Sequence, residues 1–431
     1  MEINMKKSNK VIKFGIFGLS RGKSFIDGIL ACGGEIVALC DADVERIAER
    51  QKRLPDAKGY TDFDEFLNHD GLDAVVIANY FHEHAPFAIK ALEKNIHVLS
   101  ECTAASTMAE AVALVRAAEK SDAIYMLAEN YPYMKLNQEM RRVYQGGSLG
   151  KVLFAEGEYN HPIWNDWSTG DCLELLCPHS KHWRYHMPRV YYITHSLAPL
   201  CYITGAMPKR VTALPVSHPF TKENCLSDLY WRLPDRSAIV NTFNDDGSVF
   251  RVTGWAQFGA EDNSYRICGT EGQIENVRGD DGRIMLRYND YAIPEGMQKV
   301  NSYYPDWNLE DKALAESAGH GGGDFFVAKE FCAAIRENKQ PMFDVYFAAT
   351  LSSVAIFAHR SALEYGVPYD IPDLRLEEER VKWENDHLTP MYGSDGSEPT
   401  MPNTHLSEYL PTEESMAEYD KAVAEYRSRK K

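Results

Sequence analysis

The stretch VIKFGIFGLSRGK, residues 11–23, decides the fold of the first part of the chain. Its opening residues form a compact apolar run, which predicts a buried strand, and glycine follows where that strand must turn into a helix. In a dinucleotide fold this turn brings a pyrophosphate against free N–H groups at the helix N-terminus. The usual pattern is G-x-G-x-x-G, and its positions hold Gly18, Ser20 and Lys23 here. A glycine-rich turn without a ligand remains the alternative, and the predicted cofactor-binding residues of the turn are Gly18, Ser20, Arg21, Gly22 and Lys23.

An acidic residue at the end of the second predicted strand strengthens this interpretation. Asp41 follows EIVALC (35–40) and stands 23 residues after Gly18. A carboxylate at this place accepts hydrogen bonds from both hydroxyls of an adenosine ribose and repels a 2′-phosphate. The sequence therefore predicts NAD rather than NADP, while Asp43 is expected to cap the next helix.

Short apolar strands continue to alternate with amphipathic helices up to about residue 129. The further strands predicted are LDAVVIAN (72–79), HVLS (97–100) and IYMLAE (124–129), and MAEAVALVRAAEK (108–120) has helical spacing. This alternation is typical of a parallel sheet that is covered on both faces. Asn79 ends the predicted strand at 72–79, and His84 follows it, where the nicotinamide loop should lie. We expect both residues to contact the cofactor.

The pattern changes after a long helix predicted at about 134–146. Strand-like runs follow at 151–159, 210–216, 236–243 and 249–258, with two closing helices at 325–338 and 347–366. We predict an α/β protein with an N-terminal Rossmann dinucleotide-binding domain over 1–130. A C-terminal α/β domain with a large mixed or antiparallel sheet, for substrate binding and oligomerisation, should follow over 131–370. Residues 371–431 then form an extension that hugs the surface, reaches a neighbouring subunit, or is loosely ordered.

The amino-acid composition disfavours some classes of binding partner. The chain of 431 residues carries 46 Lys+Arg against 63 Asp+Glu, a formal net charge of −17, which disfavours nucleic acid and anionic membranes. No apolar run approaches the roughly 20 residues of a membrane span. Nine cysteines without a C-x-x-C pair fit a reducing compartment, so we expect a cytoplasmic protein.

Over about residues 11–366 the chain resembles the Gfo/Idh/MocA family, which includes glucose–fructose oxidoreductase and inositol dehydrogenase. The resemblance implies a nicotinamide domain followed by an open α/β domain whose sheet often forms an oligomer interface, and thus a homo-oligomer, a dimer or larger. The family signature Glu-Lys-Pro is Glu101-Cys102-Thr103 here. Glu101 matches the signature, but Cys102 occupies the position of the lysine that often transfers the proton in family dehydrogenases. Cys102 would be a nucleophile only with a depressed pKa, and a small packing residue is the favoured interpretation.

Downstream motifs resemble the NAD-dependent glycosidases of glycoside hydrolase family 109 in the same superfamily. The matching stretches are Glu129-Asn130, Tyr159-Asn160-His161, Trp183-Arg184, Tyr192-Ile193-Thr194-His195-Ser196-Leu197-Ala198-Pro199 and Gly319-His320-Gly321-Gly322-Gly323-Asp324-Phe325. Ala198 replaces a glycine of the family. The resemblance implies that four residues line the sugar pocket with catalytic roles: Glu129, Tyr159, Tyr192 and His195. It also implies cofactor contacts from Glu101 and Asn130, and substrate contacts from His161, Trp183, Arg184 and His320.

Oxidation of a sugar hydroxyl requires a base that is neutral near pH 7, and histidine suits this role. Tyr192 and His195, three residues apart, would share a face of a helical turn, which favours a Tyr–His pair. We expect carbohydrate metabolism, first as an NAD-dependent oxidoreductase that oxidises a ring secondary hydroxyl, at C3, to a 3-keto product. The alternatives are an NAD-dependent glycosidase that uses transient C3 oxidation, elimination and re-reduction, with Tyr159 or Glu129 acting at C2, and a non-catalytic NAD/sugar-binding sensor.

A histidine cluster leaves one further alternative open. His179, His182 and His186 have a spacing that could ligate a transition metal, or they form a polar pocket wall near Trp164 and Trp167. Redox chemistry with NAD needs no metal, so none is predicted. Lys181 and Arg184 could bind an anionic group on the sugar or take part in ordinary surface pairs.

Overall fold

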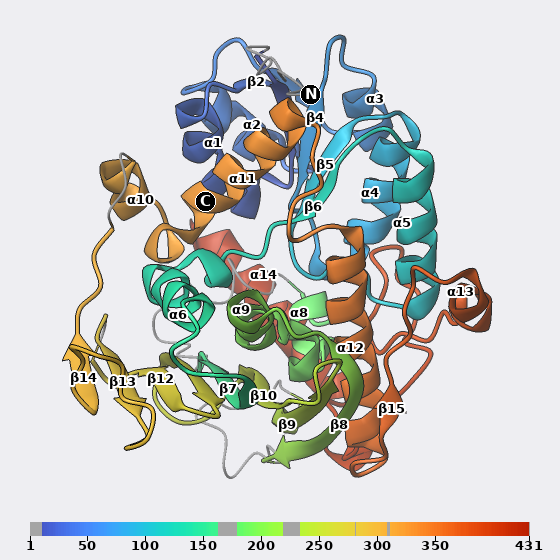
Figure 1. Cartoon of the computed structure of the whole chain (residues 1–431). Helices are drawn as coiled ribbons and strands as arrows, with labels where there is room; N and C mark the ends of the chain where they lie inside the picture. Colours follow the sequence, from blue (N-terminus) through green and yellow to red (C-terminus); the bar gives the residue numbers. More distant parts are fainter. Residues whose placement is uncertain (1–10, 163–178, 219–232, 281, 308–310, 431) are drawn as a thin grey trace.

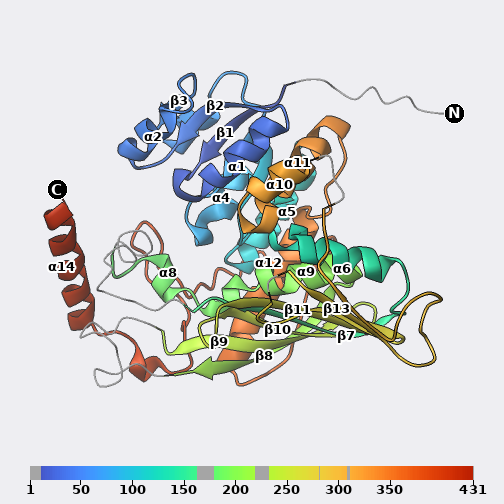
Figure 2. The same cartoon turned by 90° about the vertical axis from the view of Figure 1, so that its left-hand side faces the viewer.

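Two sheets, with a layer of helices between them, organise the chain (Figure 1). The computed structural model describes residues 11–162, 179–218, 233–280, 282–307 and 311–430. Figure 2 shows the smaller sheet and its helices above and the larger sheet below, with α6, α9 and α12 in the layer that separates them. Among the helices within these ranges, none is both long and apolar enough to cross a membrane.

The first sheet has six strands, all parallel, in the order β3-β2-β1-β4-β5-β6. Its strands are β1 (Lys13–Phe17), β2 (Glu35–Cys40), β3 (Lys58–Tyr60), β4 (Ala74–Ile77), β5 (His97–Ser100) and β6 (Tyr125–Leu127). Its helices are α1 (Leu19–Ala31), α2 (Val44–Gln51), α3 (Phe63–Leu67), α4 (His84–Glu93) and α5 (Met108–Lys120). This strand order is that of a Rossmann fold, which confirms the predicted fold of the first part of the chain.

The second sheet has nine strands in the order β14-β13-β12-β11-β7-β10-β9-β8-β15. The strands are β7 (Val152–Asn160), β8 (Pro208–Ser217), β9 (Asp235–Asn244), β10 (Val249–Ala256), β11 (Asp262–Gly269), β12 (Gly272–Asn276), β13 (Ile284–Tyr288), β14 (Val300–Tyr303) and β15 (Tyr369–Asp370). Within the described ranges β10 pairs with β7 in parallel and the other pairings are antiparallel. The predicted mixed sheet is therefore confirmed.

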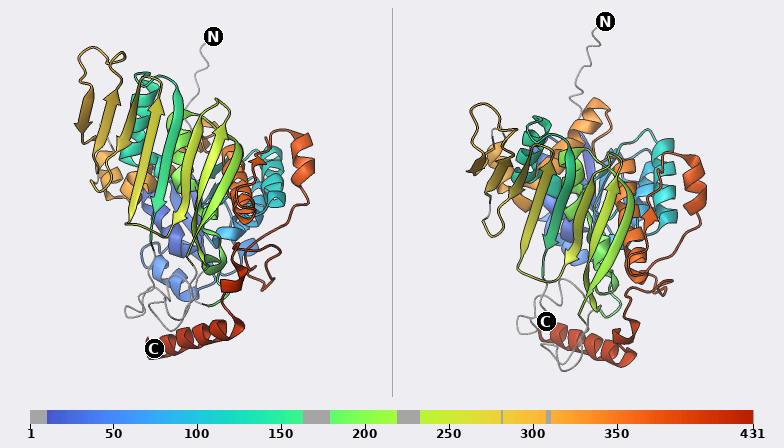
Figure 3. Two further views of the ribbon diagram at one scale, coloured as in Figure 1. Left: turned by 90° about the horizontal axis from the view of Figure 1, so that it is seen from below. Right: turned by 60° about the horizontal axis from the view of Figure 1, so that its bottom comes forward.

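Helices α6 (Lys135–Gln145), α9 (Thr194–Thr204) and α12 (Val345–Leu363) cover one face of this sheet, whereas α11 (Gly323–Glu337) packs on α1, and α10 (Lys312–Ser317) packs on α11. The remaining short elements are α8 (Trp183–His186) and the 3-10 turns η1 (Phe81–Glu83), η2 (Tyr131–Tyr133), η3 (Arg189–Tyr192) and η4 (His320–Gly322). The α12 helix is buried on nearly every side, as expected for an apolar helix inside a core. Figure 3 shows that the opposite face of the sheet is left uncovered by the described elements.

Two glycines let the helical layer approach the sheet closely. A Cβ atom on Gly157 of β7 would lie 2.1 Å from the carbonyl oxygen of Ser196 in α9, and one on Gly254 of β10 would lie 2.6 Å from that of Arg189 in η3. Distances below 3 Å are not tolerated by real side chains, so only glycine permits this packing. The two contacts fix the start of α9 and the start of η3 against the sheet.

The C-terminal extension hugs the surface of the molecule. It contains α13 (Glu377–Trp383), η5 (Ser407–Tyr409) and α14 (Glu413–Lys430). Arg360 of α12 pairs with Asp386 at 2.7 and 2.8 Å, and the carbonyl of Asp386 accepts a hydrogen bond from the N–H of Ala109. Further along, Tyr419 of α14 is buried, and its hydroxyl accepts a hydrogen bond from that of Tyr185 in α8 at 2.9 Å. The described residues of the extension thus make contacts within the chain, and a role in reaching a neighbouring subunit stays a prediction.

The substitution Gly157→Ala tests the close approach of β7 and α9. In an unconstrained strand, alanine would stabilise the fold by roughly 0.5–1 kcal/mol relative to glycine. Overlap with Ser196 should reverse the sign and lower the free energy of unfolding by about 1–3 kcal/mol. Urea unfolding of the variant measures this, and Ala155→Gly on the same strand is the matched exchange of one methyl group. A Gly157→Ala variant that is more stable than the wild type would contradict the packing described.

Candidate active site

The turn after β1 has the geometry of a dinucleotide-binding turn. Gly18 has φ +84°, and a Cβ atom there would lie 2.3 Å from the carbonyl oxygen of Ala78 at the end of β4. Only glycine fits this left-handed conformation and this contact. Gly18 has no side chain to cap α1, so the first turn of the helix, apart from the N–H of Leu19 that donates to Asp41, can present N–H groups to a pyrophosphate.

Asp41 lies directly beside this turn at the end of β2. Its carboxylate is buried and accepts hydrogen bonds from the N–H groups of Leu19, at 2.8 Å, and Asp43, at 3.0 Å. Arg46 approaches the same carboxylate at 3.0 Å. Asp43 accepts from the N–H groups of Glu45 and Arg46 at the start of α2, so the predicted helix cap is confirmed. Ser20 and Lys23 are exposed on the first turns of α1. The glycine turn, the open helix N-terminus and the acidic strand end together fit an NAD molecule.

Arg21 joins the first domain to α11. Its Nε donates to Glu101 Oε1 at 2.5 Å, and its Nη2 donates to Asp324 Oδ1 at 2.9 Å. Asp324 is buried and also accepts from Asn130 Nδ2 at 2.7 Å, while His320 Nδ1 lies 2.9 Å from its second oxygen. Burial alone would raise the pKa of Asp324, but the hydrogen bonds of His320 and Arg21 outweigh it and hold that pKa well below its ordinary value. Asp324 is therefore ionised at the start of α11, where its negative charge is paired with the positive charge of Arg21.

Glu129 and His195 form a buried pair at the junction of the two sheets. Glu129 follows β6 and is fully buried, and His195 lies in the first turn of α9 with Nδ1 2.7 Å from Glu129 Oε1. The same oxygen accepts from the N–H of Tyr131, at 3.2 Å. Burial would raise the pKa of Glu129, but attraction to His195 and hydrogen bonds from neighbouring donors outweigh it and lower that pKa. With Nδ1 donating to an ionised carboxylate, the other imidazole nitrogen is left as the acceptor.

Three tyrosine rings surround His195. Tyr131 stacks on the imidazole with ring centroids 4.0 Å apart, and Tyr159 and Tyr192 each meet it edge-on at 4.9 Å. The contact between Tyr192 and His195 confirms the prediction from their spacing of three residues. Burial raises the pKa of Tyr159 to about 12 and that of Tyr192 well above its ordinary value. Near neutral pH these phenols are therefore proton donors.

The residues predicted to contact substrate lie around the same rings. His161 stacks on Tyr159 at 5.7 Å, and His320 lies 6.2 Å from Tyr131. Trp183 stacks on Phe81 at 5.4 Å, Phe81 in turn stacks on Tyr192 at 5.3 Å, and the guanidinium of Arg184 lies over Trp183. The structure thus gathers residues from β7, α8, η3, α9 and η4 at one place between the two sheets.

Two of the predicted cofactor residues, His84 and Asn79, lie close to the carboxyl ends of strands in the first sheet. His84 is buried, and its Nδ1 lies 2.9 Å from the carbonyl oxygen of Thr103 in the loop that follows β5. Burial lowers the pKa of His84, so it is neutral. Asn79 lies two residues after the end of β4, at the contact with Gly18. Both residues lie at the carboxyl ends of the parallel strands, where this fold binds its ligands.

The histidine cluster has the features of a polar wall. His186 Nε2 lies 2.9 Å from the carbonyl oxygen of Ser180, and His182 caps α8 by accepting from the N–H of Arg184. Burial lowers the pKa of His182 to about 3 and that of His186 to about 4. No group of three potential metal ligands was found among the described residues. Trp164 and Trp167 lie outside the described residues. Lys181 pairs with Glu398 of the extension on the surface.

Sequence reasoning missed three residues of the site. Tyr131 stacks on His195, Asp324 binds Arg21, and the hydroxyl of Tyr265 donates to the carbonyl oxygen of His195 at 2.6 Å. Tyr131 comes two residues after Glu129, which was a usable signal, and Asp324 was part of a quoted motif without a role. Nothing in the local sequence marks Tyr265.

Comparisons with known proteins agree with this geometry. Residues 12–129 match the model of an oxidoreductase family with an NAD-binding Rossmann fold, and residues 261–384 match the C-terminal domain of glycosyl hydrolase 109. A glycosyl hydrolase family 109 protein of Saccharopolyspora erythraea is 25% identical over 88% of this chain and 86% of that protein. An alpha-N-acetylgalactosaminidase of Tannerella forsythia is 26% identical over 85% of this chain and 87% of that protein.

Solved structures show the same fold. Levoglucosan dehydrogenase in complex with NADH and L-sorbose superposes with a TM-score of 0.70 at 19% identity, over 84% of this chain and 100% of that one. An inositol dehydrogenase homologue from Azotobacter vinelandii, complexed with NAD+, superposes with a TM-score of 0.67 at 18% identity, over 86% of this chain and 100% of that one.

The substitution Asp41→Asn tests the cofactor turn. It removes the charge that the ribose hydroxyls would meet, and a hydrogen bond to a charged group contributes about 1.5–3 kcal/mol, so NAD affinity should fall about 10-fold or more. Isothermal titration calorimetry with NAD+ measures this. Asp43→Asn is the matched control, because asparagine still caps α2 and affinity should stay within about twofold. Equal affinity in the Asp41→Asn variant and the wild type would contradict the site.

Proposed function

Because the chain belongs to the Gfo/Idh/MocA oxidoreductase family, with a glycosyl hydrolase 109 C-terminal domain, it is an NAD-dependent enzyme, and we propose that it hydrolyses a glycosidic bond through transient oxidation at C3 of the sugar. The observation that carries the proposal is the buried Glu129–His195 pair inside a ring of protonated tyrosines, next to the cofactor turn. The match of residues 261–384 to the glycosidase domain favours hydrolysis over simple dehydrogenation. The order of the first two hypotheses from the sequence is therefore reversed.

In the first step His195 removes the proton from the sugar hydroxyl. Glu129 holds Nδ1, which leaves Nε2 as the base and stabilises the imidazolium that forms. Tyr192, in edge-on contact with the imidazole, donates a hydrogen bond to the reacting oxygen. The turn at Gly18 and Asp41 would hold NAD, which would supply the hydride acceptor for oxidation at C3 and the hydride donor for the final reduction.

Oxidation at C3 makes the proton on C2 acidic, and its removal expels the aglycone from C1. Water then adds to the unsaturated sugar, so the route does not need the paired carboxylates of ordinary glycosidases. Of the two candidates for C2, Tyr159 is half-buried at the edge of the aromatic cluster, whereas both oxygens of Glu129 are already engaged and the residue is fully buried. We therefore propose that Tyr159 serves at C2, where its phenol must first give up its own proton to water before it can act as the base, and that Glu129 orients His195.

The substrate is proposed to be an N-acetylhexosaminide, with α-N-acetylgalactosaminides first, since relatives of similar length carry that activity in their names. His161, Trp183, Arg184 and His320 would contact the sugar. An NAD-dependent sugar dehydrogenase that releases a 3-keto product is the second candidate, because the Glu129–His195 pair alone suffices for the first half of the cycle. A non-catalytic sensor is disfavoured by the intact hydrogen bonding of that pair.

We also propose that the protein forms a homo-oligomer, a dimer or larger, through the uncovered face of the nine-stranded sheet. The strand register places on this face Phe243, Val249, Leu214, Arg251, Glu156, Arg266 and Glu275. Phe243 is 53% exposed, and around it apolar and charged side chains of both signs alternate. Such a pattern is self-complementary when two copies meet about a twofold axis.

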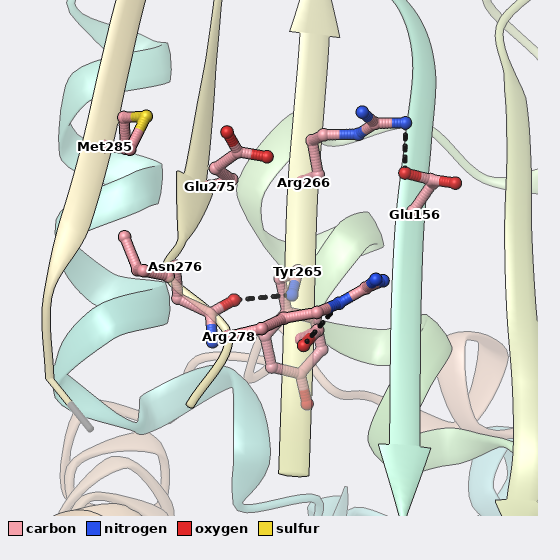
Figure 4. A pocket seen from close by; sticks show the side chains of 9 residues that line it. Glu156, Tyr265, Arg266, Glu275, Asn276, Arg278 and Met285 are labelled. Carbon is pink, nitrogen blue, oxygen red and sulfur yellow. Dashed lines mark hydrogen bonds and ion pairs between the residues drawn. The ribbon is translucent and has the colours of Figure 1, made fainter. Parts of the chain in front are cut away.

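Figure 4 shows a hollow on this face. It is lined by residues of β7, β11, β12 and β13, and Arg266 forms an ion pair with Glu156 across it. Arg251 pairs with the same carboxylate from the other side. The face is therefore preorganised by its own ion pairs.

We propose that the protein is located in the cytoplasm, because its nine cysteines lack a disulfide-type spacing.

The substitution Phe243→Glu tests the oligomer. It places a charge on the uncovered face, and we expect the molar mass measured by light scattering after gel filtration to fall from that of a dimer or larger toward that of one chain. Lys90→Glu on α4, which breaks an exposed ion pair with Asp64 of α3, is the control and should leave the mass unchanged. A wild-type protein that runs as a monomer would contradict the proposal.

The function is tested by product analysis. Purified enzyme, with NAD+ added, is incubated with p-nitrophenyl N-acetylhexosaminides of both anomers, and products are identified by mass spectrometry. We expect free p-nitrophenol and an unoxidised sugar without net NADH. A product two hydrogens lighter that keeps its aglycone, together with NADH, would establish the dehydrogenase instead.

The variant His195→Ala is the control for this measurement. Loss of the base should lower turnover by about 100-fold or more, the usual contribution of a general base. Tyr192→Phe, which keeps the ring but removes the phenol, should lower turnover as well. Wild-type rates in both variants would show that the reaction takes place elsewhere.

A further inference from the structure

The loop that follows β5 places a thiol directly behind the Glu129–His195 pair. Cys102 is 4% exposed, and its Sγ donates to Glu129 Oε2 at 3.0 Å. This is the carboxylate oxygen that His195 does not use, since Nδ1 of His195 binds Oε1 at 2.7 Å. The thiol and the imidazole therefore hold the two oxygens of one carboxylate.

The surroundings of Glu129 make each donor important. The titratable groups that face it come from all the neighbouring elements: Cys102 after β5, Tyr131 on η2, Tyr159 on β7, His195 on α9 and Tyr265 on β11. Among the described residues, no lysine or arginine forms an ion pair with Glu129. The negative charge is therefore held by neutral donors and by His195, and each donor lost would favour protonation.

Cys102 is suited to donate and unsuited to attack. Burial raises the pKa of its thiol well above the ordinary value, and the charges of Glu129 and Glu101 raise it further. The thiol therefore stays protonated throughout the range in which the enzyme would work. A nucleophilic role needs the thiolate, which these surroundings disfavour.

The loop that carries Cys102 is fixed on both sides. The N–H of Cys102 donates to Glu101 Oε2 at 3.1 Å, and the carbonyl oxygen of Thr103 meets His84 Nδ1 at 2.9 Å. From the other side, Ser352 Oγ of α12 lies 3.1 Å from Thr103 Oγ1 and accepts from the N–H of Ala105 at 3.2 Å. With its backbone held in this way, the thiol is fixed beside the Glu129 carboxylate.

We propose that Cys102 is a positioning residue, whose thiol keeps the Glu129 carboxylate ionised and turned so that its other oxygen orients His195. The hydrogen bond itself is a property of the site, and its effect on turnover rests on the proposed function. A simple packing role, expected from the sequence, would need only the volume of the side chain. The proposal requires the donor.

Infrared difference spectroscopy tests the hydrogen bond without any substrate. The S–H stretch falls in a spectral window where other protein groups absorb little, and subtracting the spectrum of Cys102→Ser identifies the band of Cys102. We expect a band at low wavenumber, typical of a thiol bound to a carboxylate, which moves to higher wavenumber in Glu129→Gln. A band at the position of an unbonded thiol, unmoved in Glu129→Gln, would overturn the proposal.

The pH dependence of turnover tests the consequence, with p-nitrophenyl α-N-acetylgalactosaminide as the probe. Without the donor, the Glu129–His195 pair should take up its proton at higher pH. The acid limb of kcat/KM should then move up by about half to one pH unit in Cys102→Ala and return in Cys102→Ser, whose hydroxyl donates. Cys201→Ala, which removes another buried thiol on α9, is the control and should leave the limb in place.

The outcomes separate the two proposals. If Cys102→Ala and Cys102→Ser both show the wild-type acid limb, Cys102 only packs, and the inference is wrong. If Cys102→Ser fails to restore a limb that moved in Cys102→Ala, the volume of the side chain and not its donor matters, which also overturns it. If the wild type does not turn over the probe, the proposed function fails for this substrate, and the infrared result alone decides the role of Cys102.

Discussion

A single buried carboxylate, that of Glu129, imposes the main constraint on this structure. An isolated charge in a protein interior is very costly, so it persists only where donors surround it. Here the donors come from the loop after β5, from η2 and from the first turn of α9. These segments belong to both halves of the chain, so the charge exists only when the second sheet and its helices are docked on the first.

The rest of the architecture serves this docking. Gly157 and Gly254 bring α9 and η3 onto the large sheet, which sets His195 and Tyr192 in place. Arg21, in the first turn of α1, binds both Glu101 and the buried Asp324 of α11. One connected set of polar contacts would therefore hold both a cofactor at the turn and a sugar among the tyrosines. The extension adds a second connection through Asp386, which binds both α12 and the start of α5.

The parts of this account that the sequence could predict are those with a local cause. Apolar runs located β2 and β5 to the residue, and helical spacing did the same for α5. The spacing of three residues was enough to predict the contact between Tyr192 and His195. Short or polar strands such as β11 and β14 carry too weak a pattern, and their pairing depends on the rest of the sheet. The bond between Arg21 and Asp324 joins residues 303 apart, and the contact of Cys102 with Glu129 depends on how β5 and β6 are aligned. Such contacts are set by tertiary packing.

The most direct test of the central claim is hydrolysis of a glycoside in heavy water. If the bond is broken through oxidation at C3 and proton removal at C2, the sugar product must carry deuterium at C2, and proton NMR will show the loss of that signal in step with aglycone release. A product that keeps its full C2 proton while the aglycone is released would mean direct displacement at C1, and would contradict the role assigned to the Glu129–His195 pair.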